Sequence, residues 1–84
     1  MTNNIRIQRS IKKVTQEQMA EAIGVTRQAI YSLENNRYQP ALLLACRIAF
    51  YFGKRVDEIF MLENADVEDI IKAKANQTFL LNKN

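Results

Sequence analysis

Two helix-start signals, Thr15 and Thr26, with a helix-ending glycine between them, constrain the fold of this chain more than any other feature. Thr15 opens a capping-box pattern, in which a hydroxyl at the N-cap and a glutamine three residues later satisfy each other's backbone N–H groups. Gly24 follows the last apolar residue of this segment, and glycine ends helices readily because no Cβ opposes the left-handed conformation. Thr26 offers the next N-cap. The sequence therefore predicts two short helices, at residues 15–23 and 26–35, set at a large angle by a tight turn.

Apolar residues at helical spacing predict further helices on both sides of this pair. One helix is expected at residues 5–12, and another from Pro40, which suits a first turn because it lacks an N–H, to Gly53. A single turn at 56–60 follows. The apolar stripe of the first helix is Ile7, Ile11 and Val14, and the residues expected to face the core elsewhere are Met19, Ala20, Ile23, Ala29, Ile30, Leu33, Leu44, Ala45, Cys46, Ile48, Ala49, Phe52, Ile59 and Phe60.

The lack of histidine and the single cysteine exclude most catalytic and metal-binding chemistry. Without histidine there is no His-based acid–base catalysis and no His-ligated metal, and one cysteine forms neither an internal disulfide nor a four-cysteine zinc site. A chain of 84 residues has no room for a cofactor domain beside a substrate domain. We therefore expect no enzyme activity, no cofactor, no metal and no small-molecule substrate.

Charge and hydropathy indicate where the protein works. No apolar run approaches the roughly 18–20 residues that span a bilayer, and the start of the chain lacks an export signal, which predicts a cytoplasmic protein without a membrane contact. Residues 1–55 carry nine Lys/Arg against three acids, whereas residues 56–84 carry three lysines against six acids. Such a balance suggests that one face meets a polyanion, although ordinary solvated surface explains it equally well.

The residues of the two central helices and their surroundings form a pattern that extends over residues 4–62. They are Thr15, Gln16, Glu17, Ala20, Gly24, Val25, Thr26, Arg27, Gln28, Ile30, Glu34, Asn35, Pro40, Leu44, Ala45, Ile48, Ala49, Phe52, Gly53, Glu58, Ile59 and Phe60. In this order and register they resemble the Cro/phage-repressor (xenobiotic-response-element) helix-turn-helix family, and within it the short single-domain regulators.

The resemblance implies an all-α fold, a five-helix lambda-repressor-like DNA-binding domain over residues 1–62 in which the helix at 26–35 is the recognition helix. Residues 63–84 are then a C-terminal tail that serves dimerisation or docking. Part of this tail, Asp66–Ala75, also suits a helix, because acids come first and lysines last, as the helix dipole favours.

Four residues of the recognition helix are the expected base-reading residues, namely Arg27, Gln28, Tyr31 and Ser32. N-terminal residues of such a helix face base edges. Arginine matches O6 and N7 of guanine, and glutamine matches N6 and N7 of adenine. Tyr31 suits a thymine methyl group or a phosphate. Taken without the resemblance, Arg27 and Gln28 would fit a solvated first turn better.

Contacts with the DNA backbone are expected on both sides of the recognition helix. The expected phosphate-binding residues are Gln16, Thr26, Asn35, Asn36, Arg37 and Tyr38. Gln16 begins a helix, where free N–H groups suit a phosphate, and the resemblance places the loop at 35–38 along the DNA backbone. The resemblance also implies a salt bridge between Arg9 and Glu34, so that Glu34 is a structural carboxylate and not a catalytic one.

Four positions depart from the family pattern, and one of them is Gln8, where leucine is common. Lys13 and Asn36 stand where glycine is usual, which predicts a longer or strained turn at Lys13. Tyr31 stands where relatives often have a small polar residue, so the preferred DNA sequence remains open.

The helix that follows Pro40 carries more apolar residues than a core needs. Leu43, Phe50 and Tyr51 stand where relatives are usually polar, and an exposed apolar stripe invites a partner. One explanation is a homodimer interface through these residues, which we favour. The other is a docking site for the chain's own tail, through Val67, Ile70, Ile71, Phe79, Leu80 and Leu81.

These observations predict a cytoplasmic bacterial or phage transcriptional regulator that binds double-stranded DNA. It is expected to act as a repressor and to bind a palindromic operator as a homodimer. The alternative is a protein-interaction module, such as an antitoxin or anti-regulator, that acts through its tail.

Overall fold

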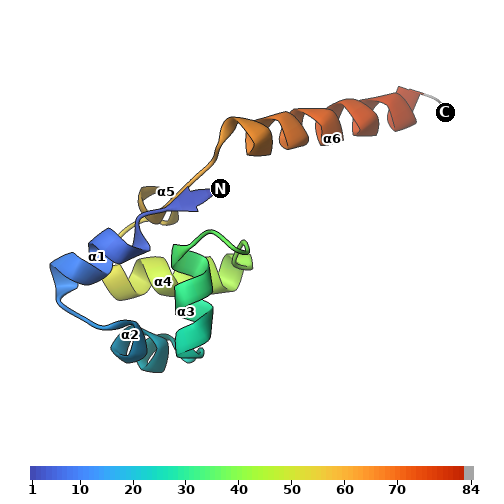
Figure 1. Cartoon of the computed structure of the whole chain (residues 1–84). Coiled ribbons are helices and arrows are strands. Elements are labelled where there is room, and N and C mark those ends of the chain that lie inside the picture. The colour runs from blue at the N-terminus through green and yellow to red at the C-terminus, as the bar shows by residue number, and fades with distance from the viewer. Residues whose placement is uncertain (83–84) are drawn as a thin grey trace.

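The computed structural model describes residues 1–82, and the side chains of residues 1–76. It confirms a mostly helical fold in which five short helices form the body (Figure 1). In chain order the elements are β1 (Thr2–Asn3), α1 (Ile5–Lys12), α2 (Gln16–Ile23), α3 (Arg27–Glu34), α4 (Leu42–Phe52), α5 (Val56–Ile59), β2 (Phe60–Met61) and α6 (Asn64–Asn82).

Local chemistry sets the bounds of α2 and α3 as the sequence predicts. Thr15 Oγ1 accepts a hydrogen bond of 3.0 Å from the backbone N–H of Gln18. In return, the side-chain oxygen of Gln18 accepts a hydrogen bond of 2.9 Å from the backbone N–H of Thr15. Thr26 caps α3 by accepting from Ala29 at 3.1 Å. Gly24 ends α2 at a φ of 87°. The two helices therefore meet across a short turn, with α3 crossing α2 (Figure 1).

The core forms where these helices meet and contains six large side chains that are fully buried: Ile5, Met19, Ile30, Leu33, Ile48 and Ile59. The stripe expected on α1 is wrong, since Ile7 and Ile11 are 61% and 69% exposed and only Val14 packs against the core. The position of Ile5 explains the difference. Ile5 and Arg9, one turn apart, face the body, so Ile7 and Ile11 lie on the outer face of α1.

A small antiparallel ladder that the sequence did not predict closes the body. Thr2 pairs with Met61 and Asn3 with Phe60. The Asn3 side chain also donates to the backbone oxygen of Leu33 at 2.7 Å, which fixes this ladder to the end of α3.

The start of α4 also differs from expectation. Ala41 is its N-cap, so Pro40 lies just before the helix rather than in its first turn. The N-cap has no side-chain hydrogen bond, so no capping side chain signals this boundary in the sequence.

Two residues that replace the family's glycines adopt positive φ angles. Lys13, which ends α1, has a φ of 61° and Asn36 has a φ of 56°. Asparagine tolerates this region well, whereas a lysine there is strained by contact of its Cβ with the backbone. The sequence-based prediction of strain at Lys13 is therefore confirmed.

We expect Lys13→Gly to raise the free energy of unfolding by about 0.5–1 kcal/mol. Relief of the left-handed strain is worth about 1–2 kcal/mol, and the greater freedom of glycine in the unfolded chain offsets about half of it. Ser10→Gly is the control, because Ser10 is exposed within α1 in ordinary helical conformation, and it should lower stability by roughly 0.5 kcal/mol. Denaturant unfolding measures both, and equal losses would contradict this explanation.

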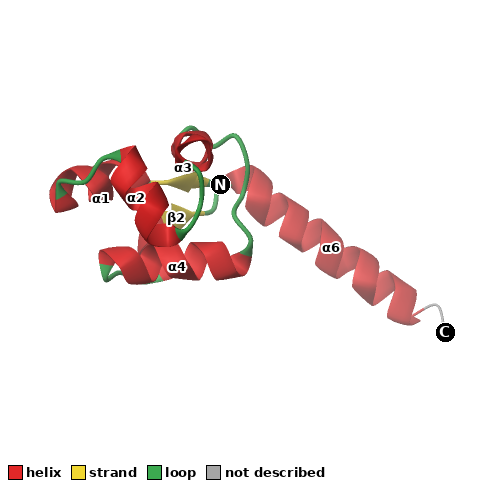
Figure 2. Cartoon of the chain, turned by 90° about the horizontal axis from the view of Figure 1, so that it is seen from below, coloured by secondary structure: helices red, strands yellow, loops and turns green. Residues whose placement is uncertain are grey.

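The last helix, α6, projects from the body (Figures 1 and 2). It extends well beyond the predicted Asp66–Ala75, and the molecule is 54 Å long but only 22 × 21 Å across. Val67, Ile70 and Ile71 are 42%, 56% and 61% exposed. The less favoured alternative, in which these three residues dock on α4 of their own chain, is therefore wrong. The side chains of Phe79, Leu80 and Leu81 lie outside the described residues.

Candidate nucleic-acid interface

The first turn of α3 presents two polar side chains to solvent. Ile30 and Leu33 point into the core. Because they fix the inward face of the helix, Arg27 and Gln28 lie on its outward face and are exposed. Tyr31 follows one turn later and is 42% exposed, whereas Ser32 is half-buried. The structure therefore brings three of the four expected base-reading residues to the surface and leaves Ser32 less accessible.

The beginning of α2 lies beside this turn. Gln16, Arg27, Gln28 and Tyr31 line one hollow of about 250 Å³. Gln16 and Arg27 also line a neighbouring hollow of about 600 Å³ that reaches back to Lys13. The residues expected to contact bases and the glutamine expected to contact phosphate therefore share one continuous surface.

The loop after α3 folds back against the helix. Arg37 lies over the ring of Tyr31, with its guanidinium carbon 5.2 Å from the ring centroid. The Asn35 side chain donates to the backbone oxygen of Tyr31 at 2.8 Å, and the backbone N–H of Arg37 donates to the backbone oxygen of Ser32 at 2.9 Å. These contacts hold a positive charge next to the residues that the sequence predicts to read bases.

The other three residues expected to bind phosphate also make contacts within the protein, as Gln16, Asn35 and Arg37 do. Thr26 caps α3 through its side chain. The side-chain oxygen of Asn36 accepts from Asn3 at 3.0 Å, and the Tyr38 hydroxyl donates a long hydrogen bond of 3.4 Å to Ala29. Asn36 and Tyr38 are nevertheless exposed, so their remaining hydrogen-bonding capacity faces solvent.

A buried carboxylate joins the three helices that form this surface. The Glu34 side chain is 0% exposed. It accepts from Arg9 Nε at 2.5 Å and from Gln16 Nε2 at 2.9 Å, and Arg6 Nε lies 3.6 Å away. Arg9 also donates to the backbone oxygen of Val14 at 3.0 Å. Because these donors come from α1 and α2 while Glu34 belongs to α3, the network fixes the relative positions of all three helices.

The environment of Glu34 favours its charged form. Burial alone would raise its pKa, but hydrogen bonds from Arg9 and Gln16 and the positive charges of Arg9 and Arg6 outweigh burial and lower the pKa. Sequence reasoning missed Arg6 and Gln16 as partners of Glu34. Arg6 and Arg9 are three residues apart on one helix, a spacing that would have indicated a shared neighbour.

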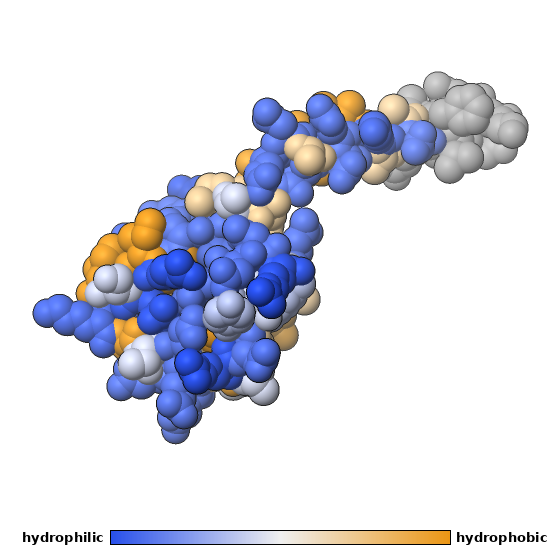
Figure 3. Space-filling model, in the orientation of Figure 1, coloured by the Kyte–Doolittle hydropathy of each residue, from blue (hydrophilic) through white to orange (hydrophobic). Residues whose placement is uncertain are grey.

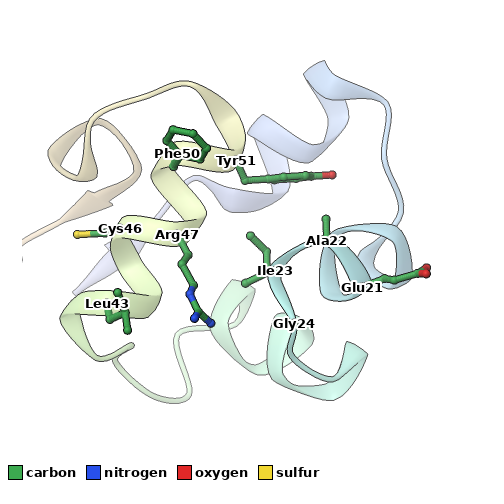
Figure 4. Close-up of a pocket in the computed structure, with 9 residues that line it drawn as sticks. All are labelled: Glu21, Ala22, Ile23, Gly24, Leu43, Cys46, Arg47, Phe50 and Tyr51. Carbon is green, nitrogen blue, oxygen red and sulfur yellow. The ribbon is translucent and has the colours of Figure 1, made fainter.

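The face of α4 carries a groove on a different side of the molecule. Leu43 and Phe50 are 67% and 89% exposed. With the end of α2 they line a groove of about 860 Å³ (Figure 4). Cys46 is exposed, so the expectation that it is buried is wrong: on α4 it lies between Leu43 and Phe50, on the outer side.

Tyr51 is less available than expected. It is half-buried and packs against the core, Lys12 Nζ lies 4.8 Å from its ring centroid, and the Phe52 ring meets it edge-on at 5.0 Å. Tyr51 therefore lines the groove while it also packs against the core. A further apolar area lies on the α1 side of the body (Figure 3), where Ile7 and Ile11 are exposed.

Within the part of the chain that the structure describes, no helix has the length and apolar character needed to cross a membrane. The same part holds no cluster of three or more Cys, Asp or Glu side chains arranged to bind a metal ion.

Known proteins match both the sequence and the fold. A helix-turn-helix family model matches residues 5–59. An uncharacterized HTH-type transcriptional regulator of Methanocaldococcus jannaschii is 39% identical over 64 residues, which cover 76% of this chain and 97% of that protein. Another, from Methanothermobacter thermautotrophicus, is 47% identical over 64 residues, covering 75% and 93%. YgzD of Bacillus subtilis, also an uncharacterized HTH-type transcriptional regulator, is 36% identical over 63 residues, covering 75% and 96%.

The crystal structure of a transcriptional regulator from Listeria innocua has a similar fold, with a TM-score of 0.59 at 13% identity over 99% of this chain and 94% of that one. The sequence relatives include archaeal and bacterial proteins, so the bacterial or phage origin inferred from the sequence stays a prediction. The family consists of regulators and not of enzymes. The capped pair α2 and α3, the matched family model and these relatives show that the chain belongs to the helix-turn-helix family of DNA-binding transcriptional regulators.

Proposed function

We propose that this protein is a cytoplasmic repressor that binds a palindromic operator as a homodimer, with α3 in the major groove. The observation that carries the proposal is the exposed first turn of α3. There Arg27 and Gln28 stand free of the core beside Gln16 and Tyr31. This is the part of a recognition helix that meets base edges.

Arg27 and Gln28 are the proposed readers of sequence, with Tyr31 and the less exposed Ser32 one turn behind them. An arginine that contacts guanine or a glutamine that contacts adenine through two hydrogen bonds discriminates against other bases by about 1–3 kcal/mol. Tyr31 supports Arg37 through the ring contact and offers its edge to a thymine methyl group or a phosphate.

The proposed phosphate contacts flank this reading surface. On one side are Gln16, at the N-terminal end of α2, and Thr26. On the other side is the loop of Asn35, Asn36, Arg37 and Tyr38. Helix N-termini and arginine side chains bind phosphate oxygens without reading sequence, so these residues set the position of α3 rather than its preference.

We expect Arg37→Ala to weaken binding to all duplexes alike. Losing one phosphate contact should reduce the slope of log K against log salt by about 1 and leave the preferred sequence unchanged. Arg55→Ala is a control that removes the same charge from an exposed site, where Arg55 pairs only with Asp57 among the described residues. Titrations at several salt concentrations measure the slopes, and a changed sequence preference in Arg37→Ala would contradict the assignment.

A homodimer suits this function because one recognition helix contacts few base pairs. Two recognition helices about 34 Å apart would enter successive major grooves of a palindromic site. The exposed residues Leu43 and Phe50, with the half-buried Tyr51, offer one surface to a second copy. A dimer on a promoter would repress by blocking polymerase.

The experiment that tests the proposal is selection of binding sites from random duplexes at a stated salt concentration. We expect a palindromic motif with guanine and adenine at conserved positions of each half-site. Protection of the DNA that flanks the protein's own gene then locates the operator. Enrichment of no motif would leave only sequence-independent binding and overturn the proposal.

One observation favours a second candidate function. The projecting helix α6 exposes Val67, Ile70 and Ile71, as an interaction module that acts through its tail would. In that case, replacing Arg27 and Gln28 would leave the biological activity intact. Under the proposed function the same change removes it.

A further inference from the structure

Lys13 has a backbone conformation that does not require a lysine. It ends α1 with a φ of 61°, in the left-handed region where the Cβ of any residue but glycine crowds the backbone. The turn is held by the backbone, because the N–H of Lys13 donates to the carbonyl oxygens of Arg9 and Ser10. A glycine would form the same bonds without the strain. The lysine side chain therefore calls for a separate explanation.

Two structural explanations for Lys13 are weak. The dipole of α1 favours a positive charge at its end, but Arg9 and Lys12 already supply two in the last turn. A third charge gains less from the dipole than the left-handed conformation costs. An ion pair with Glu17, which lines the same hollow, would be the other explanation. Within the described part of the chain, Lys13 forms no ion pair, with Glu17 or with another carboxylate.

The hollow beside Lys13 continues into the surface that carries the proposed base readers. Lys13, Gln16 and Arg27 line the hollow of about 600 Å³. Gln16 and Arg27 also line the smaller hollow that Gln28 and Tyr31 complete. Lys13 itself is exposed. A duplex that receives the first turn of α3 in its major groove therefore brings the phosphates along one edge of that groove to this hollow.

The hollow contains one cationic side chain that is free for a phosphate. Its cationic residues are Arg9, Lys13 and Arg27. Arg9 is engaged with the buried Glu34, and Arg27 is the proposed reader of guanine. Gln16 carries no charge and donates from its side chain to Glu34. Among the described residues that line this hollow, Lys13 is thus the cation without a task inside the protein.

We propose that Lys13 binds a DNA phosphate on the Gln16 side of the recognition helix. An ammonium group on a long flexible stem suits a phosphate as a point charge. Strained backbone conformations persist where function uses them, and this contact gives the strain at Lys13 such a use. The inference rests on the proposed function and adds a binding residue to it. The family's usual glycine has no side chain for this contact, so the contact distinguishes this chain.

Salt titrations of the full chain test the contact. Lys13→Gln removes the charge and keeps a Cβ in the strained position, whereas Lys13→Gly removes both. Each should lower the slope of log K against log salt by about 1 for every copy bound. Between about 50 and 200 mM salt, the affinity of the unchanged chain should then fall about threefold more, per copy, than that of either variant. Lys13→Arg should keep the slope.

Lys54→Gln is the matched control for charge. Lys54 is exposed in the turn after α4 and does not line the hollow, so its loss should change the slope clearly less. A change in Lys13→Gln no larger than in Lys54→Gln would overturn the proposal, because Lys13 would then act only through net charge. Since Lys13→Gly should be more stable than the unchanged chain, its weaker binding cannot be ascribed to unfolding.

Uncharged phosphates locate the contact on the duplex. Single phosphates of the selected operator are replaced by methylphosphonates, and the binding of the unchanged chain and of Lys13→Gln is compared at each position. At one position in each half-site the replacement should weaken the unchanged chain and leave Lys13→Gln unaffected. Equal losses in the two proteins at every position would overturn the proposal.

Failure of this contact and failure of the proposed function give different results. If Lys13 binds no phosphate, substitution of Arg27 and Gln28 still removes the sequence preference. If α3 does not read bases, no motif is selected, yet the salt slope on an unrelated duplex still reports whether Lys13 contacts the DNA backbone, because that contact does not depend on sequence.

Discussion

Arg27→Ala combined with Gln28→Ala should abolish sequence-specific DNA binding and leave the fold intact. Both side chains are exposed and neither contributes to the buried core. Each contact through two hydrogen bonds discriminates by about 1–3 kcal/mol, and a dimer makes each contact twice. The combined loss is comparable to the whole gap of about 4–10 kcal/mol between specific and non-specific binding. We therefore expect affinity for the selected operator to fall by about a thousandfold or more.

The residual binding identifies the cause of this loss. The double variant should bind the operator and an unrelated duplex equally, at the non-specific level, with an unchanged unfolding transition. Arg27→Lys is the informative partner, since it keeps the charge but loses the planar two-donor geometry. It should relax preference at one base pair while keeping the salt dependence. A double variant that still preferred the operator by more than about tenfold would show that α3 does not read the bases.

The position of this surface could be predicted because local chemistry determines it. The caps at Thr15 and Thr26 and the left-handed Gly24 act over three or four residues, so the sequence contains all the information needed to place α2 and α3. Once α3 is placed, burial of Ile30 and Leu33 leaves Arg27 and Gln28 outside. The matched family model and the relatives agree with the helix-turn-helix fold that these caps and the glycine predict.

The features that were missed depend on contacts between distant residues. The stripe of Ile7 and Ile11 obeys helical spacing, yet the face of α1 that turns inward is decided by Arg9, which reaches the buried Glu34 on α3. The partnership of Gln16 with Glu34 arises in the same way. The periodicity of one segment alone therefore predicts neither the inward face of α1 nor the contact between Gln16 and Glu34.

The boundaries of α4 and α6 were missed for a different reason. Ala41 caps α4 without a side-chain hydrogen bond, and neither glycine nor proline follows residue 75 to end the last helix. A boundary without a capping or breaking residue leaves no mark that sequence reasoning can use. The ladder of β1 and β2 is likewise too short for a period-two pattern.

Glu34→Ala should cost about 3–5 kcal/mol of folding free energy, the largest effect on stability that we expect from a polar residue of this protein. The substitution leaves the Arg9 guanidinium, which is 18% exposed, without its counter-ion. Breaking a buried pair by removing one partner costs this much because the other charge stays buried and unpaired. A domain of this size is stable by only about 5–10 kcal/mol, so the substitution should remove a large part of that stability and lower the unfolding temperature clearly.

Two further variants separate the stranded charge from simple loss of contacts. Asp57→Ala removes the exposed partner of Arg55, at 2.7 Å, and should cost no more than about 1 kcal/mol. Arg9→Met combined with Glu34→Met replaces both charges by apolar side chains and should be more stable than Glu34→Ala. If the double variant were instead less stable than the single one, the cost would lie in packing and not in the unpaired guanidinium.

The pH dependence of stability tests the same network without mutation. Because the pKa of Glu34 is lowered in the folded state from its ordinary 4.5, the unfolded state binds the proton more tightly. The contribution of Glu34 is therefore complete above about pH 4.5 and is lost as the pH falls through the folded pKa. The unfolding free energy of the unchanged chain should decline over this window, and that of Glu34→Gln should decline less, since its side chain does not titrate. Parallel declines in the two proteins would assign the acid sensitivity to other carboxylates, and Glu34 would then not be the acid-sensitive link that holds α1 and α2 against α3.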